Sequence, residues 1–279
     1  MASARAADGT LLHYRVCDYT EPWRQAPVLV LQHGFARHGG FWHAMLPTLA
    51  RHYRVVCPDL RGLGKSGTGF DGAAVTLDTY LDDLLRVLDH LDAGAVHYAG
   101  ESFGGMLGFH LAARHPGRLR SLCAITTPPA PVMPAPESYP LFGYSSWAEA
   151  LRQMGAGAWC RAANAATRFP PDADPGLVEW YASEGGACDL EALIALARVI
   201  QAVDLSALLD QVRVPVLGLY PSAAKTVTNR QMELLRRVPD LRVIHLPGTY
   251  HMIWALQPGA CARHLLHFIG QIDGLACVS

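Results

Sequence analysis

Short apolar runs alternate with amphipathic segments through the first half of the chain. Runs of this kind occupy residues 27–31, 53–57, 95–99 and 119–125. Continuous apolar strands are typical of a parallel sheet, because both of its faces are covered by helices. Between the second and third runs, residues 77–91 place leucines at the spacing of a helix, with acidic residues between them. The alternation predicts an α/β fold with a mostly parallel central sheet and helices on both faces.

The alternation stops near the middle of the chain and resumes later. The intervening stretch is rich in proline at its start and carries aromatic residues among short helical segments. Strand signals then return at residues 215–220 and 241–246, each followed by a helical segment. We therefore predict one core formed by residues 1–128 and 206–279, with residues 129–205 inserted into it as a helical cap, or lid.

Composition and charge argue against two classes of partner, nucleic acids and membranes. The 279 residues carry 23 Lys and Arg against 24 Asp and Glu, for a formal net charge of -1, and no basic run occurs. This balance argues against nucleic acid as a partner. No apolar stretch approaches the roughly 20 residues that cross a bilayer, so we expect no membrane contact.

The N-terminus and the cysteines indicate the compartment. The first residues lack the apolar core of a secretory signal, so we expect a cytoplasmic protein. The seven cysteines are odd in number and show no metal-ligand spacing, which is typical of free thiols in a reducing compartment. We expect no metal and no organic cofactor, and a monomer or homodimer that acts on a small-molecule substrate.

The most informative motif is Gly100-Glu101-Ser102-Phe103-Gly104. It follows a predicted strand and precedes a predicted helix, so Ser102 lies at the apex of a sharp turn. Glycines on both sides permit the close backbone approach that such a turn needs. The hydroxyl then stands at the positive end of the following helix. We interpret Ser102 as a nucleophile; the alternative is an incidental turn built of small residues.

His251 is the candidate general base. A serine hydroxyl is a weak nucleophile unless an adjacent base removes its proton. His251 follows a glycine-containing loop between the last predicted strand and the last helix. Because the carboxyl ends of parallel strands share one edge of the sheet, we expect Ser102 and His251 to meet there. The alternative is an ordinary surface or core histidine, the interpretation that we keep for the other histidines.

The segment His33-Gly34-Phe35-Ala36 follows the first core strand and is the candidate oxyanion hole. The glycine frees the backbone at this point. We predict that the backbone N–H groups of Phe35 and Phe103 together hold the negatively charged oxygen of a tetrahedral intermediate. The alternative is an ordinary glycine turn.

These motifs resemble those of the α/β-hydrolase superfamily over nearly the whole chain. Four of them carry the resemblance in the family's order: residues 33–35, residues 58–64, the turn around Ser102 and residues 248–251. The resemblance implies the α/β-hydrolase fold, the three roles given above, and a cap that shapes the substrate pocket. It does not specify the substrate, because this fold hosts many reactions.

The acid that usually completes a catalytic triad is missing from both of its usual positions. One position, counted from Pro215, falls on Ala224. The other, after the strand that follows the nucleophile helix, reads Ile125-Thr126-Thr127-Pro128. The acid orients the histidine and stabilises its cation, and disabling it in a serine protease costs roughly 10⁴ in rate.

Three explanations for the missing acid stay open. A hydroxyl, such as that of Ser222 or Thr126, orients His251 in its place. Alternatively a carboxylate from elsewhere does so, with Asp204 and Glu101 the nearest candidates. In the third case His251 works as a weaker base. For Glu101 we favour a buried structural carboxyl, because the turn directs neighbouring side chains apart.

Aromatic side chains form the candidate substrate pocket. The cap contributes Trp147, Trp159, Trp180 and Tyr181, and Trp42 stands just past the oxyanion segment. Together they favour an apolar or aromatic substrate, although ordinary packing within the cap explains each of them equally well.

Two basic residues, Arg37 and His38, directly follow the oxyanion segment. They are placed to meet a carboxylate or carbonyl group of a substrate. We nevertheless expect both side chains in a solvated loop, since charged residues in a loop are usually exposed.

We therefore predict a serine hydrolase that acts on an ester or lactone of a small apolar or aromatic compound. Ser102 attacks the carbonyl, His251 passes the proton to the leaving group, and water cleaves the acyl-enzyme. Hydrolysis of an amide or a C–C bond is the alternative on the same site. Alternatives of other classes are a lyase or cofactor-free oxygenase that uses His251 as base, and a ligand-binding protein.

Overall fold

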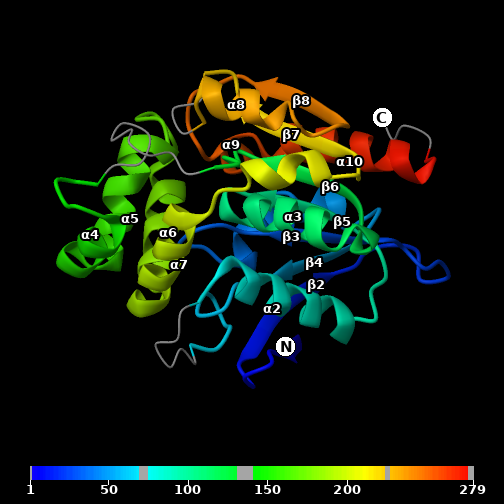
Figure 1. Ribbon diagram of the computed structural model, residues 1–279, viewed down its shortest axis with the longest axis horizontal. Helices are drawn as coiled ribbons and strands as arrows, with labels where there is room; N and C mark the ends of the chain where they lie inside the picture. Colours follow the sequence, from blue (N-terminus) through cyan, green and yellow to red (C-terminus); the bar gives the residue numbers. More distant parts are fainter. Residues whose placement is uncertain (1, 69–74, 131–140, 224–226, 276–279) are drawn as a thin grey trace.

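The computed structural model describes residues 2–68, 75–130, 141–223 and 227–275. The strands in these ranges form one sheet. The strand order is β1-β2-β4-β3-β5-β6-β7-β8. Only β1 with β2 and β2 with β4 pair antiparallel, and the other pairs are parallel. The strands are β1 (Ala2–Arg5), β2 (Leu11–Cys17), β3 (Val28–Gln32), β4 (Arg54–Pro58), β5 (Val96–Glu101), β6 (Leu119–Ile125), β7 (Val216–Pro221) and β8 (Leu241–Leu246). The structure confirms the predicted mostly parallel sheet (Figure 1).

The parallel strands end at a common edge. Gly100, next to the last residue of β5, lies opposite Gln32 at the end of β3 and opposite Ala124 near the end of β6. The end of β7 is in turn level with that of β8, where Pro221 lies opposite Leu246. Segments that follow these strands therefore gather at one edge of the sheet.

Helices cover both faces of the sheet. They are α1 (Leu46–Leu49), α2 (Leu77–His90), α3 (Phe103–Arg114), α8 (Asn229–Leu235), α9 (Ile253–Leu256) and α10 (Pro258–Asp273), with short 3₁₀ turns η1 (Gly39–Ala44), η2 (Pro116–Arg118) and η4 (Ser206–Gln211). Alternate strand residues enter different apolar layers, so that Val30 packs with α2 and α3 while Leu29 and Leu31 pack with α1 and α10. This two-residue alternation is the geometry of a pleated strand covered on both sides.

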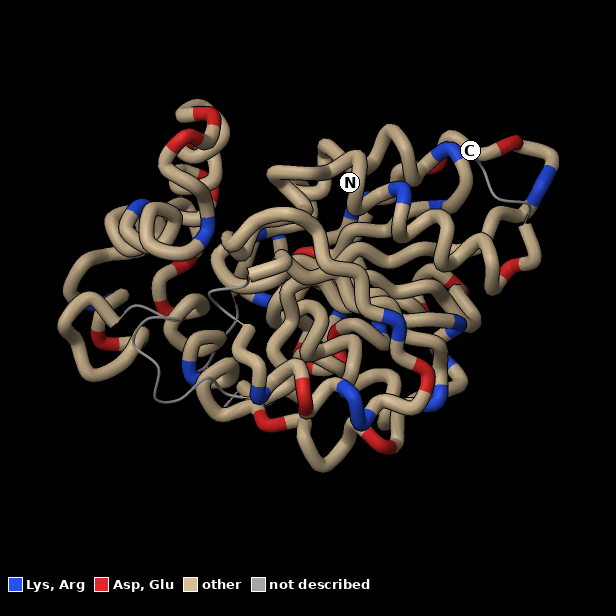
Figure 2. The backbone as a smooth tube through the Cα atoms, turned by 90° about the horizontal axis from the view of Figure 1, so that it is seen from above, with Lys and Arg blue, Asp and Glu red and all other residues tan. Residues whose placement is uncertain are grey.

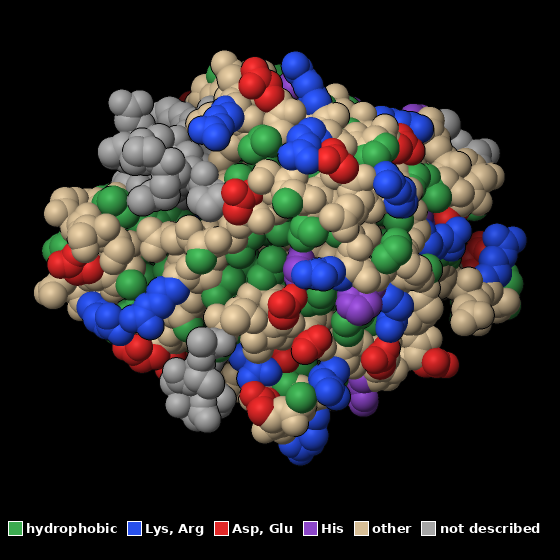
Figure 3. Space-filling view, viewed as in Figure 1, with side chains coloured by type: hydrophobic (Ala, Val, Ile, Leu, Met, Phe, Trp, Pro, Cys, Tyr) green, Lys and Arg blue, Asp and Glu red, His purple; other side chains and the backbone are tan. Residues whose placement is uncertain are grey.

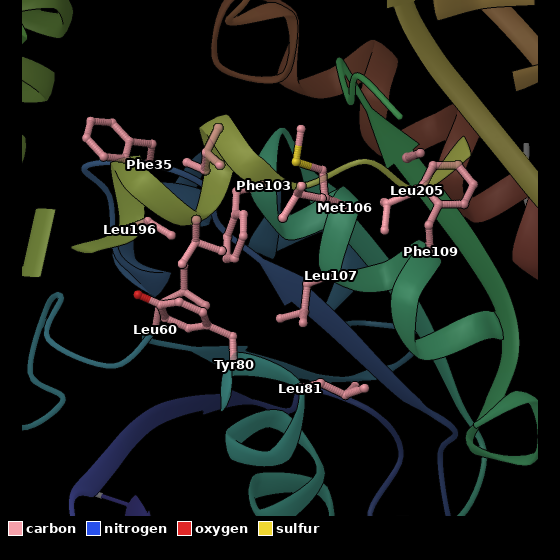
Figure 4. Packing of buried hydrophobic residues seen from close by; sticks show 14 of the residues in the cluster. Phe35, Leu60, Tyr80, Leu81, Phe103, Met106, Leu107, Phe109, Leu196 and Leu205 are labelled. Carbon is pink, nitrogen blue, oxygen red and sulfur yellow. The ribbon is translucent and has the colours of Figure 1, made fainter. Parts of the chain in front are cut away.

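Helix α3 lies at the centre of the first apolar layer. Its residues Phe103, Met106 and Leu107 are all but fully buried. Figure 4 shows Phe103, Met106 and Leu107 on the same side of α3 as the buried residues Tyr80 and Leu81 of α2. The rings of Phe103 and Tyr80 meet edge to face, with their centroids 5.2 Å apart. The first turn of α3 is therefore packed against α2.

The chain between β6 and η4 forms a separate group of helices beside the sheet, here called the cap helices (Figures 1 and 2). They are α4 (Trp147–Met154), α5 (Ala156–Ala163), α6 (Pro175–Gly186) and α7 (Leu190–Ala202), and a π-helical turn, η3 (Asn164–Arg168), continues α5. Ser146, Asp174 and Asp189 cap the first turns of α4, α6 and α7 with their side-chain oxygens.

Basic and acidic residues are mixed over the described chain, in agreement with its balanced charge. Figure 2 shows basic and acidic residues interspersed along the backbone. The six cysteines within the described ranges are free thiols. In the same ranges no helix is both long and apolar enough to cross a bilayer, and no cluster of His, Cys, Asp and Glu has the geometry to hold a metal ion.

The turn between β5 and α3 leaves no room for a side chain at Gly100. A Cβ atom there would clash with the backbone of Gly104 and Gly105, which cannot move without breaking the first turn of α3. We predict that Gly100→Ala lowers the free energy of unfolding by about 1–3 kcal/mol, as expected for overpacking at a rigid site. Denaturant unfolding followed by circular dichroism measures this.

The matched control is Gly117→Ala. A Cβ atom at Gly117 meets no other atom within 4 Å, and this glycine does not have a positive φ. Its substitution should change the free energy of unfolding by no more than about 0.5 kcal/mol, the usual range for exposed sites. Equal stability of the two variants would contradict the tight turn described here.

Candidate active site

Ser102 stands at the apex of the turn between β5 and α3. Its φ of 53° and ψ of -117° lie outside the regions that residues with a side chain ordinarily adopt. Hydrogen bonds hold this strained backbone: Ser102 N donates to the Ile125 carbonyl at 3.0 Å, and the Ser102 carbonyl accepts from Gly105 N and Met106 N. Strain that is held so firmly is typical of a functional site.

His251 lies in the loop between β8 and α9, and this loop is bonded to the cap. The backbone N–H of His251 donates to the Thr167 carbonyl at 3.0 Å, and that of Met252 donates to the Arg168 carbonyl at 3.3 Å. Both acceptors belong to the π-helical turn η3. The imidazole is only 6% exposed. The cap therefore helps to fix the backbone that carries the candidate base.

Ser102 and His251 line the same cavity, as predicted from the strand order. Its volume is about 30 Å³. The other lining residues come from the oxyanion segment, the end of β5 and the cap, and are Phe35, Arg37, Glu101, Trp147, Trp159, Ala163, Thr167, Arg168 and Ile200. Most of the residues that line the cavity belong to the cap, which therefore covers the site.

Burial and the charges of two arginines together lower the pKa of the candidate base. Burial, followed by the nearby charges of Arg37 and Arg168, lowers the pKa of His251 to about 3. The imidazole is therefore neutral at physiological pH and able to accept a proton. The same surroundings disfavour the imidazolium cation that forms when it does so.

Of the two predicted oxyanion donors, Phe35 lines this cavity and Phe103 directly follows Ser102, which does so. Phe103 is the first residue of α3, where a backbone N–H has no partner within the helix. Phe35 lines the cavity, and its side chain packs against Trp147 and Trp159 with ring centroids 5.3 and 5.2 Å apart. Its carbonyl accepts a hydrogen bond from Arg37 Nη1 at 2.9 Å, which anchors the segment. The oxyanion role of both amides stays a prediction.

The groups considered as substitutes for the missing acid lie at different places. Ser222 is exposed, and its hydroxyl contacts both the N–H and the carbonyl of Gly248 at 3.3 Å, so it holds the loop of His251 and not the ring. Thr126 is fully buried outside the cavity, and its hydroxyl has no hydrogen-bond partner among the described residues. Ala224 lies outside the described ranges.

Asp204 lies on a different part of the molecule. Its carboxylate accepts a hydrogen bond from Ser206 N at 2.8 Å, at the start of η4. It borders a wider hollow of about 760 Å³ between α7 and the first turns of α2, where hydrophobic side chains gather on the face shown in Figure 3. This placement argues against Asp204 as the group that orients His251, because α7 lies between the two cavities.

The expectation of a solvated Arg37 is wrong. The side chain is 3% exposed, and its Nε lies 3.2 Å from Oε1 of Glu101, itself 1% exposed. Arg37 also donates to Met252 Sδ at 2.8 Å. Burial raises the pKa of Glu101, while Arg37 and Arg168 oppose the rise. The neighbouring His38 is not free in solvent either, since its Nε2 lies 2.8 Å from Oε2 of Glu184 in α6.

Only part of the predicted aromatic pocket borders the cavity. Trp147 and Trp159 line it. Trp42, Trp180 and Tyr181 lie outside it, in an aromatic cluster between η1, α6 and α9. Trp42 is fully buried against the ring of Trp254 at 4.6 Å. Trp180 and Tyr181 of α6 join the cap to the core through contacts with Phe41 and Trp254, whereas Trp42 packs within the core.

Sequence reasoning missed Arg168 altogether. It is the last residue of η3 and is buried in the cavity wall, although arginine is rarely buried without a partner. Nothing in the local pattern distinguishes it from an exposed arginine, because its burial arises where the cap meets the loop of His251.

Comparison with known proteins agrees with this architecture. A family model described as the alpha/beta hydrolase fold matches residues 27–162. A pimeloyl-[acyl-carrier protein] methyl ester esterase of Aeromonas hydrophila is 30% identical over 258 residues, which cover 90% of this chain and 98% of that protein. A putative carbamate hydrolase RutD of Pantoea ananatis is 38% identical over 100 residues, 36% of each chain.

Solved structures show the same arrangement. A hydrolase from Pseudomonas aeruginosa is similar with a TM-score of 0.82 and 26% identity, over 96% of this chain and 98% of that one. An enol-lactonase from Burkholderia xenovorans has a TM-score of 0.84 at 24% identity, over 96% and 99% of the two chains. At that identity the second likeness shows the fold alone.

The pKa of His251 leads to a prediction on pH dependence. A neutral imidazole is needed to activate Ser102, so labelling of Ser102 by a fluorophosphonate should stay fast as the pH falls to about 5, well below the usual histidine pKa. The rate of labelling between about pH 4 and 8, with circular dichroism at each pH to confirm folding, measures this. A loss of rate centred near pH 6.5, the ordinary value, would contradict the burial described here.

Proposed function

This chain belongs to the α/β-hydrolase family, and within that family we propose that it is a serine hydrolase acting on an ester or lactone of a small apolar or aromatic compound. The observation that supports the proposal is that a strained Ser102 and a neutral, buried His251 line one small cavity. Ester hydrolysis also agrees with the methyl ester esterase to which this chain is 30% identical.

The reaction begins when Ser102 Oγ attacks the carbonyl carbon and its proton passes to an imidazole nitrogen of His251. The backbone N–H groups of Phe35 and Phe103 hold the oxygen that becomes negatively charged. The tetrahedral intermediate collapses, the bond to the leaving oxygen breaks, and the imidazolium gives that oxygen its proton. Water then repeats these steps on the acyl-enzyme and releases the acid, so that protons and electrons balance.

The surroundings of His251 favour a substrate with a good leaving group. Arg37 and Arg168 disfavour the imidazolium cation, and no carboxylate occupies the positions from which the family usually supplies one. A phenol or enol leaves as a relatively stable anion and needs little proton donation, whereas an alkoxide or amine needs much more. We therefore propose an aryl or enol ester, or a lactone of that type, ahead of an amide.

The apolar walls support an apolar body for the substrate. Trp147, Trp159 and Ile200 line the cavity and provide the contact surface that aromatic and aliphatic groups prefer. The cavity has little free volume, and the cap supplies Trp147 and Trp159 to its lining, so we propose that the cap helices shift away from the sheet edge to admit the substrate. We propose that this opening precedes each turnover.

The test is acyl-enzyme formation on Ser102. A nitrophenyl ester should give a burst of nitrophenolate, and a fluorophosphonate should label Ser102, as peptide mapping will show. Ser102→Ala should abolish both, and His251→Ala should lower the rate by at least about 10³, since the two residues act as a unit. His245→Ala is the matched control, because His245 is exposed on β8 and lies far from the cavity lining.

Two results would contradict the proposal. Absence of both burst and label on the native enzyme would argue for a ligand-binding protein. Turnover of a substrate that survives Ser102→Ala but is lost in His251→Ala would indicate a lyase or cofactor-free oxygenase, in which the imidazole removes a proton from carbon. Burst kinetics with an anilide or a ketone, and none with esters, would indicate amide or C–C bond hydrolysis.

A further inference from the structure

Two arginines are buried in the wall of the Ser102 cavity. Arg37 is 3% exposed and Arg168 is 8% exposed. Removing a guanidinium from water is costly unless an anion compensates its charge, so each of the two requires a partner. The partners differ between the two.

Arg37 has an anionic partner within the protein. It forms an ion pair with Glu101 at 3.2 Å, and donates to the Phe35 carbonyl and to Met252 Sδ. These contacts join the oxyanion segment, the nucleophile strand and the loop of the base. Arg37 therefore serves to hold the parts of the site together.

Arg168 has neutral partners instead. Its Nη1 donates a hydrogen bond to Asn164 Oδ1 at 3.4 Å, and its guanidinium carbon lies 5.2 Å from the ring centre of Trp159. Its side chain is also hydrogen-bonded to the Cys160 thiol. Among the described residues no carboxylate forms an ion pair with it. Glu101 can neutralise one guanidinium at most, so the cavity wall keeps a net positive charge.

The position of Arg168 is set by the same hydrogen bonds that hold the base. Its carbonyl accepts from Met252 N, one residue after His251, and it ends the π-helical turn η3. Such turns inside α-helices frequently occur at functional sites. Arg168 and Ser102 thus line the same cavity.

We propose that Arg168 binds a carboxylate of the substrate, so that the substrate is an ester or lactone that also bears a free carboxylate a few bonds from the scissile carbonyl. The inference rests on the proposed function. A guanidinium matches the planar carboxylate with two parallel hydrogen bonds, and the apolar walls strengthen the pairing by excluding water.

The bound carboxylate also changes the charge around the candidate base. It offsets the arginine charge that disfavours the imidazolium form of His251, a form for which the usual family acid would otherwise provide a negative charge. Binding of the anionic substrate therefore assists proton transfer. This links the missing acid and the unpaired arginine to a single cause.

The test compares two esters that differ only in charge. One is the mono-4-nitrophenyl ester of adipic acid, and the other is the same compound with its free carboxylate blocked as a methyl ester. We expect the native enzyme to prefer the anionic ester in kcat/KM by at least about tenfold. Arg168→Gln should reduce this preference by at least about tenfold, and Arg168→Lys should retain part of it.

Arg161→Gln is the matched control. Arg161 lies on α5, seven positions before Arg168, and its exposed side chain pairs with Glu179. This variant should keep the full preference for the anionic ester. A native enzyme without the preference, or a preference that Arg168→Gln leaves intact, would overturn the proposal while leaving the hydrolase function in place.

A binding measurement tests the same proposal without the need for turnover. Ser102→Ala should bind monomethyl adipate by calorimetry at least about tenfold more tightly than dimethyl adipate. This readout needs neither turnover nor a folded Arg168 variant, so it still decides the question if the enzyme hydrolyses neither ester. Equal binding of the two compounds would overturn the anion site, whereas absent labelling of Ser102 would overturn the proposed function alone.

Discussion

The close approach of the end of β5 to the first turn of α3 is the constraint on which the rest of the site depends. Gly100 lies against the backbone of Gly104 and Gly105, so neither segment can move apart without losing the turn. The approach forces Ser102 into a positive φ, which is maintained by a hydrogen bond that Ser102 N donates to the Ile125 carbonyl and by those that the Ser102 carbonyl accepts from Gly105 and Met106. The hydroxyl is thereby presented at the sheet edge before any substrate arrives, which is the preorganisation that catalysis requires.

Contacts with the cap fix the loop that carries the candidate base, His251. The loop after β8 donates two backbone hydrogen bonds to η3, and aromatic contacts from α6 to Phe41 and Trp254 hold the cap helices on the core. Movement of the cap is therefore coupled to the position of His251. This coupling explains how a site that encloses only about 30 Å³ can open for a substrate and rebuild its geometry on closing.

Charge in the cavity is arranged unlike that of an ordinary catalytic triad. Two guanidiniums and one carboxylate surround the imidazole, where the family usually places a carboxylate behind it. Burial, together with this positive balance, keeps the base neutral at rest, and we propose that the ligand provides an anion. The positive charge of the pocket and the negative charge of the proposed substrate are therefore complementary.

The amino-acid sequence by itself determined the sheet, the nucleophile turn and the meeting of Ser102 with the loop of His251. Those features depend on local pattern and on the rule that parallel strands end at one edge. The tertiary structure alone decided the burial of Arg37, the partners of Arg168, and the removal of Asp204, Trp42, Trp180 and Tyr181 from the cavity. Burial and ion pairing depend on which segments pack together across long sequence separations, and no local pattern encodes that for a single charged or aromatic residue.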